Sequence, residues 1–421
     1  MSAQTLLRFS TAGSVDDGKS TLIGRLLFDS RSVLEDQVAN LARTTERRGG
    51  KGLDLALLTD GLAAEREQGI TIDVAYRYFA TRKRKFIIAD TPGHEQYTRN
   101  MVTGASTADL TIVLLDAKKG VQPQSRRHAA VASLLGIPHL VVAVNKMDAV
   151  GYSEERFEAI KAEFSGVIAK LKFEHVHFIP VSALEGDMTV ARGKNLPWYT
   201  GPALLELLEK VEVAKPKDAP LRFPVQFVTM PGVTGVFHRG YMGRIESGEI
   251  KKGDRVLVQP SGLSTTVRDI VTYEGSRDRA QAPQSVTLVL DGEIDISRGD
   301  LITHPETPAR PAKSVDVVIC WMDGEPMRKG GKYLVKHTTN TVKAVVERID
   351  YRLDITSLEK DTTATELALN DIGAARLKLQ RPLLVDEYAH VRETGGFIVI
   401  DEVTNHTVGA GMVLPGDSGN P

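Results

Sequence analysis

The sequence predicts an α/β domain with a mainly parallel, doubly wound sheet, followed by two small β barrels. From the start to about residue 214, short apolar runs rich in β-forming residues alternate with helical stretches, which is typical of a parallel sheet covered by helices. Beyond a Pro-containing joint at 214–220, helical periodicity nearly vanishes and Gly, Pro, Ser and Asp separate β-type runs. A second Pro-rich joint, HPETPARPA, divides those runs. We therefore expect domains at 1–214, 219–308 and 313–414.

The expected strands are short and apolar. Those of the α/β domain are LLRFST, KFIIAD, LTIVLLD, HLVVAVN and VHFIPVS. Between them lie helical stretches such as KSTLIGRLLFDS and SEERFEAIKAEFSGVIAKL, whose Ser153 can cap the first turn. The clearest barrel strands are FPVQFVTM, GYMGRIESG, DRVLVQP and SVTLVLDG, and then KAVVERIDYRL and GGFIVIDEV. No tandem repeat is evident.

Composition narrows the class of protein. The chain has 421 residues and a formal net charge of -1, so no overall positive field exists to hold a polyanion, and we expect no nucleic-acid partner. The single cysteine, Cys320, excludes an intramolecular disulfide and a thiolate metal cluster, and we expect it to be a small buried apolar side chain. The N-terminus lacks a secretion signal and no apolar run approaches the roughly 20 residues that cross a bilayer. We expect a cytoplasmic protein without a membrane partner.

A phosphate-binding loop follows the first expected strand and opens a helix. It matches G-x-x-x-x-G-K-[ST], and its residues are Gly13, Ser14, Val15, Asp16, Asp17, Gly18, Lys19 and Ser20, with Thr21 directly after them. The glycines let backbone N–H groups wrap a phosphate. Lys19 is expected to reach the β- and γ-phosphates, and the Ser20 hydroxyl to bind Mg²⁺. The alternative is an ordinary glycine turn.

A second polar segment, Asp90-Thr91-Pro92-Gly93, follows the strand KFIIA. Its carboxylate falls at the carboxyl end of a strand, where ligands bind in open α/β sheets. Asp90 can hold Mg²⁺ through water, and the Gly93 N–H can approach the γ-phosphate, whose loss would release the segment that follows. Taken alone, this tetrapeptide is equally compatible with a turn.

The residues Asn145-Lys146-Met147-Asp148 indicate which base is bound. The Asp148 carboxylate can accept hydrogen bonds from N1–H and the 2-amino group of guanine, whereas adenine offers a lone pair at N1. Asn145 can secure the other edge of guanine and the phosphate loop, and the Lys146 stem can cover the ring face. The next strand ends at Ser182-Ala183-Leu184, where a backbone N–H can meet guanine O6. The expected ligands are GTP and GDP.

One further segment, Glu65 to Ile72, lies between the phosphate loop and Asp90. It can fold over the γ-phosphate, and Thr71 can then supply a second Mg²⁺ ligand. The alternative is a charged helix end that stops at a glycine.

These elements resemble, in residues and in order, the translational class of GTPases, over about the first 214 residues. The resemblance implies that His94 orients the attacking water, making His94, Lys19 and Thr71 the catalytic residues. It also implies that Val15 and Ile70 form an apolar gate for His94. The alternatives are a surface histidine and simple loop packing.

Longer stretches, among them SVDDGKSTLIGRLLFDS, SALEGD, PWYTGP, EIDISRGDL and VGAGMV, resemble the family of GTPase subunits of bacterial sulfate adenylyltransferase nearly end to end. This resemblance implies that a separate small subunit joins ATP and sulfate into adenylylsulfate and pyrophosphate, driven by GTP hydrolysis here. The alternative is an elongation-factor-like GTPase that delivers aminoacyl-tRNA. Ser14 and Asp17 depart from the histidine or alanine that elongation factors often carry. Some relatives continue into an adenylylsulfate kinase domain; because this chain stops at GDSGNP, we expect no kinase activity.

Overall fold

The computed structural model describes residues 5–33, 36, 38–39, 41, 43, 45, 53–58, 73–94, 97–213, 219–229, 239–292, 294–355 and 357–416. The chain divides into two compact units, one of Met1–Val213 with Ile355–Leu358 and one of Ala214–Asp354 with Glu359–Pro421. The first unit contains the α/β domain, and the second contains both β barrels.

Six strands form the sheet of the first unit, in the order β2-β3-β1-β4-β5-β6. Their bounds are β1 (Thr5–Gly13), β2 (Ala75–Ala80), β3 (Arg84–Asp90), β4 (Leu110–Asp116), β5 (His139–Asn145) and β6 (His175–Pro180). β1 is parallel to β3 and β4, and parallel pairing continues through β5 to β6. The mainly parallel sheet is therefore confirmed, and the five expected runs fall in its strands.

The edge strand β2, which is antiparallel to β3, was not among the expected strands. Its sequence AYRYFA exposes Tyr76 and Tyr78 and buries Phe79, whose ring stacks on Phe86 with centroids 4.5 Å apart. Because an edge strand with one open face needs few apolar side chains, its apolar signal is weaker than that of the buried strands.

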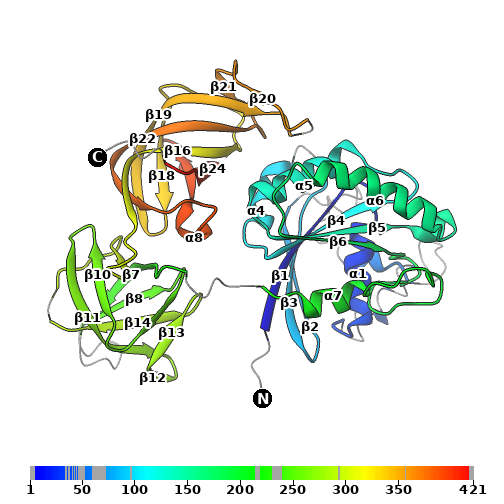
Figure 1. Ribbon diagram of the computed structural model, residues 1–421, viewed down its shortest axis with the longest axis horizontal. Helices are drawn as coiled ribbons and strands as arrows, with labels where there is room; N and C mark the ends of the chain where they lie inside the picture. The colour runs from blue at the N-terminus through cyan, green and yellow to red at the C-terminus, as the bar shows by residue number, and fades with distance from the viewer. Residues whose placement is uncertain are drawn as a thin grey trace. The chain divides into compact units, whose positions relative to one another are not determined.

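Helices cover both faces of this sheet, with α4, α5 and α6 on one side and α1 and α7 on the other (Figure 1). Their bounds are α1 (Lys19–Asp29), α4 (Thr98–Ala105), α5 (Pro123–Leu134), α6 (Glu154–Ile168) and α7 (Leu204–Lys210), with 3-10 turns η1 (Leu55–Leu58) and η3 (Met147–Val150). As predicted, Ser153 caps α6, its side chain accepting a hydrogen bond of 3.1 Å from the Arg156 N–H. The doubly wound arrangement predicted from the sequence is thus confirmed.

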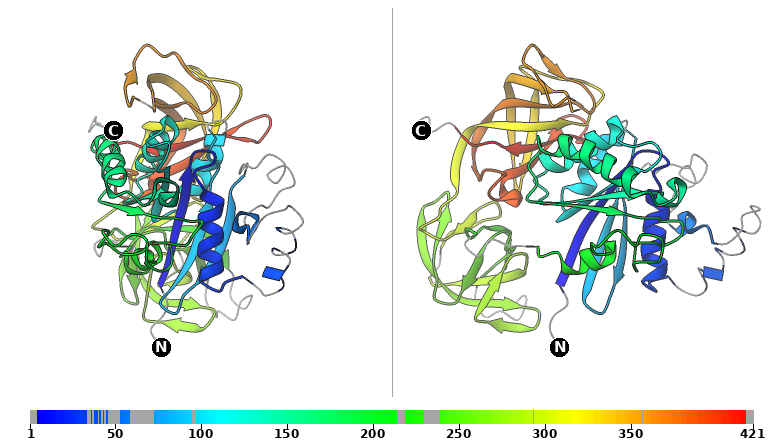
Figure 2. Two further views of the ribbon diagram at one scale, coloured as in Figure 1. Left: turned by 90° about the vertical axis from the view of Figure 1, so that its right-hand side faces the viewer. Right: turned by 45° about the vertical axis from the view of Figure 1, so that its right-hand side comes forward.

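Each barrel closes as a ring of strands, which Figure 2 shows from two further directions. The first ring runs β10-β15-β7-β8-β14-β11 and closes by pairing β11 with β10. The second runs β18-β23-β24-β16-β22-β19 and closes by pairing β19 with β18. Two barrels after the α/β domain are therefore confirmed.

The strands of the first barrel are β7 (Phe223–Thr229), β8 (Gly240–Arg244), β9 (Glu249–Lys251), β10 (Arg255–Gln259), β11 (Leu263–Thr272), β12 (Gly275–Arg277), β13 (Arg279–Gln281), β14 (Ser285–Leu290) and β15 (Leu301–Thr303). The elements of the second are β16 (Arg310–Trp321), β17 (Met327–Arg328), β18 (Lys332–His337), β19 (Asn340–Leu353), β20 (Lys360–Asp361), β21 (Glu366–Leu367), β22 (Ile372–Val385), α8 (Arg392–Gly395), β23 (Gly396–Asp401) and β24 (Thr407–Val413). β16 begins at Arg310, before the expected domain start at 313, because part of the Pro-rich joint pairs with β22.

A buried ion pair joins the two barrels. Arg222 donates two hydrogen bonds to the Asp386 carboxylate, at 2.7 and 2.8 Å, and one of 2.7 Å to the Thr307 carbonyl. The Arg222 residue is 3% exposed, so both charges are compensated away from solvent. This pair is one reason why the two barrels form one compact unit.

The three expected domain boundaries remain a proposal. It is supported by three separate apolar cores, whose members lie between Leu7 and Val211, Leu221 and Ile302, and Ala312 and Val413. Cys320 is buried, as predicted. Within the described parts of the chain, no helix is long and apolar enough to cross a membrane.

Candidate nucleotide-binding site

Four loops meet at one edge of the parallel sheet. The phosphate loop follows β1, Asp90 ends β3, Asn145 ends β5, and Ser182 comes shortly after β6. These strands are parallel, so their carboxyl ends lie on the same side of the sheet, where open α/β sheets bind ligands. The structure thus brings together the site residues that the sequence predicts in these loops.

The phosphate loop has a backbone that depends on glycine. Gly18 precedes α1 with φ +88°, and a Cβ there would lie 2.4 Å from Asn145 Nδ2. A Cβ on Gly93 would lie 2.2 Å from the Gly13 carbonyl oxygen. No side chain caps the N-terminus of α1. The N–H groups in the first turn of a helix point out of that end, where they can bind an anion.

Lys19 lies at the centre of the site and is 8% exposed. Its Nζ donates to Asp90 Oδ1 at 2.6 Å and to the Thr91 carbonyl. Asp90 is 2% exposed, so the pair holds the lysine head against the end of β3 in a place of low solvent access. A cation held beside the phosphate loop is what β- and γ-phosphates require.

The donors around Asp90 fit Mg²⁺. Ser20 lies in the first turn of α1 and Asp90 ends β3, and the Ser20 hydroxyl and Asp90 carboxylate are hard oxygen donors of the kind that Mg²⁺ prefers. Thr71, the other expected ligand, lies outside the described residues, as does Ile70. Among the residues that the structure describes, no three His, Cys, Asp or Glu side chains are grouped so that they could hold a metal ion.

The segment after β3 packs closely against the phosphate loop. Thr91 Oγ1 donates to the Thr11 carbonyl at 2.7 Å, which fixes the start of the segment. The Gly93 carbonyl accepts a hydrogen bond of 2.7 Å from Gln124 on α5, and Gln124 Nε2 lies 3.3 Å from His128 Nε2. Burial, and then the nearby Lys19 charge, lowers the pKa of His128 to about 3, so this ring is neutral near pH 7.

His94 directly follows Gly93 and is exposed. Its ring meets Tyr97 edge-on, with centroids 6.1 Å apart. Val15 in the phosphate loop is 38% exposed, so its side chain is accessible for contact. The role of His94 in orienting water stays a proposal.

Asn145 ties the base-binding loops to the phosphate loop. Its Nδ2 donates to the Asp17 carbonyl at 2.8 Å, and its Oδ1 accepts from the Ala183 N–H at 3.0 Å. Ser182 Oγ donates to Asp148 Oδ1 at 2.6 Å. Asp148 therefore presents its carboxylate from a loop that is bonded to both neighbouring loops.

Lys146 is held by a carboxylate that the sequence reading missed. Its Nζ lies 2.8 Å from Asp116 Oδ2, at the end of β4. Burial alone would raise the pKa of Asp116, but the hydrogen bonds from Lys146 and from the Lys118 N–H keep that pKa below its usual value. The signal was available, since Asp116 ends an expected strand as Asp90 does.

Arg25 and Leu184 complete the edge of the site. Arg25 Nε on α1 donates to the Ala183 carbonyl at 3.1 Å, and its guanidinium also reaches the Leu184 carbonyl. The Leu184 side chain is 62% exposed. No motif marks Arg25, because a helix arginine ordinarily faces solvent.

Asp17 is a buried carboxyl group inside the phosphate loop, 1% exposed. Its Oδ2 accepts a hydrogen bond of 2.8 Å from the Ser14 N–H. Burial raises the pKa of Asp17 to about 6, and Asp116 adds to that effect, while the Ser14 N–H, Lys119 and Lys146 oppose it. The ionised form of Asp17 therefore costs stability in the folded protein.

We expect Asp17→Asn to raise the free energy of unfolding at pH 7.5 by about 1–2 kcal/mol, and with it the melting temperature by a few degrees. The pKa of Asp17 is higher in the folded protein than in the unfolded chain, so the wild-type protein loses stability as pH rises from about 4 to about 6. The amide never ionises, so its advantage should shrink as pH falls below about 6. Melting curves of both proteins between pH 5 and 8 measure this, and a gain independent of pH would contradict it.

Comparisons with known proteins place the chain in a class. Residues 4–216 match the model of the elongation factor Tu GTP binding domain. Residues 241–303 match elongation factor Tu domain 2, and residues 314–414 match the GTP-eEF1A C-terminal domain-like family. The fold and the site thus define a P-loop GTPase of the elongation factor Tu class.

Individual relatives narrow that class. The chain is 55% identical over 413 residues to the bifunctional enzyme CysN/CysC of Mycobacterium tuberculosis (strain CDC 1551 / Oshkosh), covering 97% of this chain and 67% of that protein. It is 52% identical over 412 residues to sulfate adenylyltransferase subunit 1 of Teredinibacter turnerae (strain ATCC 39867 / T7901), covering 97% and 87%. The structure of sup35 complexed with GDP aligns with a TM-score of 0.45 at 25% identity, covering 99% of this chain and 95% of that one. The chain belongs to the sulfate adenylyltransferase subunit 1 family.

Proposed function

We propose that this chain hydrolyses GTP as the GTPase subunit of a heteromeric sulfate adenylyltransferase. In this proposal a separate, smaller catalytic subunit converts ATP and sulfate into adenylylsulfate and pyrophosphate. The observation that carries it is the 52% identity to a sulfate adenylyltransferase subunit 1 across 97% of the chain, through both barrels. Elongation factors share the domain types, so the GTPase domain alone would not separate the two functions. The cytoplasmic location expected from the sequence is part of the proposal.

Hydrolysis proceeds by in-line attack of water on the γ-phosphate, yielding GDP and inorganic phosphate. Lys19, now paired with Asp90, neutralises charge on the β- and γ-phosphates. The Gly93 N–H approaches the γ-phosphate, which its close packing on Gly13 favours. His94 orients the attacking water, and Val15 with Ile70 forms the apolar gate.

The divalent cation has an assigned set of residues. Ser20, Asp90 and Thr71 are the residues that we assign to hold Mg²⁺, which when bound neutralises charge on the phosphate oxygens. Asp90 Oδ1 lies 2.6 Å from Lys19 Nζ. One carboxylate therefore positions Lys19 and is also a proposed ligand of Mg²⁺, the two groups that neutralise phosphate charge. GTP and GDP are the nucleotides expected.

Coupling to the partner requires differential affinity. Forming the sulfate-phosphate anhydride is strongly uphill, so GTP hydrolysis can offset it only if both reactions share conformational states. The Gly93 segment is the described part of the chain that would sense the γ-phosphate, and its carbonyl is bonded to Gln124 on α5. GTP must favour one docked geometry and phosphate release another.

The guanine assignment predicts a change of base preference in one variant. In Asp148→Asn the amide oxygen can still accept from N1–H, but the amide N–H would face the guanine 2-amino group and suits the O2 carbonyl of xanthine. We expect GDP affinity to fall about 100-fold or more, and xanthosine diphosphate to become the preferred ligand. Competition binding with both diphosphates measures this. A variant that keeps its preference for GDP would remove Asp148 from base recognition.

The proposal is tested by co-expressing this chain with the small sulfate adenylyltransferase subunit of the same genome. GTPase activity is then measured with and without ATP and sulfate. We expect a stable complex, stimulation of GTP hydrolysis by those substrates, and adenylylsulfate as a product. If no complex forms, and the GTP form instead protects aminoacyl-tRNA from deacylation, the chain is a tRNA-delivery factor.

A further inference from the structure

A buried carboxylate that the proposed chemistry does not use lies behind the base-binding loops. Asp187 is 5% exposed and belongs to the turn that follows Ser182-Ala183-Leu184. Its backbone carbonyl accepts a hydrogen bond of 3.1 Å from the Ser182 N–H. Its Oδ2 accepts from the Tyr152 hydroxyl at 3.0 Å and from Asn195 Nδ2 at 2.8 Å. One residue thus joins the loop after β6 to a tyrosine of the loop after β5.

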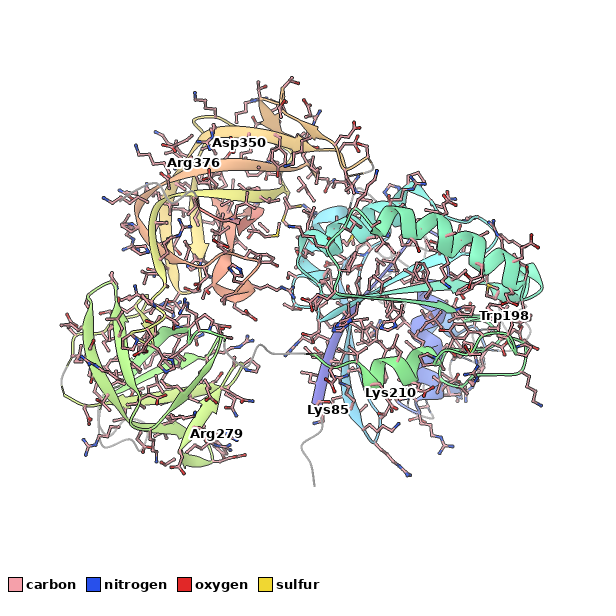
Figure 3. The ribbon with its side chains drawn as sticks, viewed as in Figure 1. Lys85, Trp198, Lys210, Arg279, Asp350 and Arg376 are labelled. Atoms are coloured by element: carbon pink, nitrogen blue, oxygen red, sulfur yellow. The ribbon has the colours of Figure 1, made fainter. Side chains whose placement is uncertain are left out.

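Tyr152 is itself fixed to the loop that carries Asp148. The Tyr152 N–H donates to the Met147 carbonyl at 2.8 Å, and the Trp198 indole N–H donates to the Tyr152 carbonyl at 2.9 Å. Trp198, labelled in Figure 3, lies in the connection between β6 and α7. Burial, and then the hydrogen bond to Asp187, raises the pKa of Tyr152 to about 12, so its hydroxyl remains a donor near neutral pH.

The chain is shaped to bring the carboxylate there. Gly193 approaches so closely that an added Cβ would lie 1.9 Å from Asp187 Oδ1, and its φ is +73°. The Met188 carbonyl accepts from the Leu204 N–H at 2.9 Å, which anchors the segment on the start of α7. A substitution at Gly193 would therefore displace Asp187 rather than fill empty space.

We propose that Asp187 is a positioning residue for guanine recognition, which acts through Tyr152 to clamp the loop after β6 to the loop after β5. The direct bond between Ser182 Oγ and Asp148 Oδ1, at 2.6 Å, joins the same two loops on the ligand side. The Asp187–Tyr152 bond joins them from behind, so the pair of bonds sets the distance between the Asp148 carboxylate and the backbone of residues 182–184. This inference rests on the proposed function, because it assumes a guanine nucleotide at the site.

Loss of the clamp should weaken the hydrogen bond from the 2-amino group of guanine to Asp148 most. That group and N1–H both donate to Asp148, and hydrogen bonds to a charged acceptor weaken steeply with misalignment. Hypoxanthine lacks the 2-amino group. When Asp148 is less well positioned, inosine diphosphate should therefore lose less binding affinity than guanosine diphosphate. The ratio of the two dissociation constants therefore reports positioning, whereas general destabilisation would move both constants together.

The test measures dissociation constants for guanosine and inosine diphosphates on the full chain, with four variants. In Asp187→Ala we expect the constant for guanosine diphosphate to rise about tenfold and the selectivity ratio to fall about fivefold. Tyr152→Phe, which removes one oxygen and keeps the ring packing, should reduce the ratio about threefold. Asp187→Asn keeps an acceptor for Tyr152 and should restore most of the selectivity. Lys194→Ala, an exposed change in the same segment, should leave the ratio unchanged.

An unchanged ratio in both Asp187→Ala and Tyr152→Phe would overturn the inference while leaving the proposed function intact. If Asp187→Ala does not fold, as judged by its melting curve, Tyr152→Phe alone decides by the same criterion. A wild-type chain that binds both diphosphates equally would contradict the guanine assignment itself, and this inference with it.

Discussion

Lys19→Met should reduce GTP turnover in the complex with the catalytic subunit by about 10³-fold and weaken GTP binding strongly. The lysine supplies the positive charge beside the phosphate loop, and methionine matches its length without that charge. The substitution also removes the partner of a buried carboxylate, since Asp90 is 2% exposed and bonded to Lys19 at 2.6 Å. Steady-state GTPase assays and nucleotide titrations measure both effects.

Lys118→Met is the matched control for this experiment. Lys118 is exposed, and its replacement by methionine changes the net charge by the same amount as Lys19→Met. The Lys118→Met variant should therefore keep GTPase activity within about twofold. Melting curves show whether Lys19→Met still folds, because an unpaired buried Asp90 costs about 3–5 kcal/mol. A folded Lys19→Met protein with wild-type turnover would refute the phosphate-binding role of the loop.

His94→Ala should lower the stimulated GTPase rate about 10²- to 10³-fold while GDP affinity changes less than about twofold. The reason is geometric: His94 directly follows Gly93, whose position is fixed by contact with Gly13 and by the bond to Gln124. A side chain that orients water acts on the rate, whereas nucleotide binding depends on the other loops. Single-turnover hydrolysis in the complex with the catalytic subunit separates the two quantities.

His94→Gln provides the control for shape, because glutamine can still accept and donate hydrogen bonds to water. Its rate should fall between those of the wild type and His94→Ala. If His94→Ala binds GTP and hydrolyses it at the wild-type rate in the complex, His94 has no role in orienting water and another group must be sought.

Much of the site could be predicted because its residues follow strand ends. A buried parallel strand is a long apolar run, and the polar residues that directly follow it are placed by the sheet rather than by distant contacts. Asp90 and Asn145 are such residues, each ending a strand in the structure. The Asn145 bond to the Asp17 carbonyl agrees with the expectation that this side chain secures the phosphate loop.

The residues that were missed act through contacts distant in the chain. Gln124 reaches Gly93 from the first turn of α5, and Asp187 reaches Tyr152 across two loops. Neither contact leaves a pattern in spacing or periodicity. The Gln124–Gly93 pair forms only when β3 and α5 are assembled on the sheet, and the Asp187–Tyr152 pair only when β5 and β6 are paired. Strand β2 was missed for a different reason, since its exposed tyrosines weaken the apolar signal.

In the barrels, too, the strands could be predicted from sequence patterns, whereas a contact between distant residues could not. Their existence followed from short strands separated by turn residues, and closure of each ring by β10–β11 and β18–β19 is what such spacing predicts. The Arg222–Asp386 pair between the barrels had no sequence signal, because an arginine at a strand start is ordinarily solvated. Family membership, rather than barrel geometry, supports the assignment to sulfate activation over tRNA delivery.

The central claim is that GTP hydrolysis on this chain drives adenylylsulfate synthesis on its partner. The most direct test measures the equilibrium yield of adenylylsulfate from ATP and sulfate in the reconstituted complex, with GTP or with a GTP analogue that cannot be hydrolysed. Our account predicts a yield with GTP well above that with the analogue, and loss of the excess in His94→Ala. Equal yields with GTP and the analogue would contradict it.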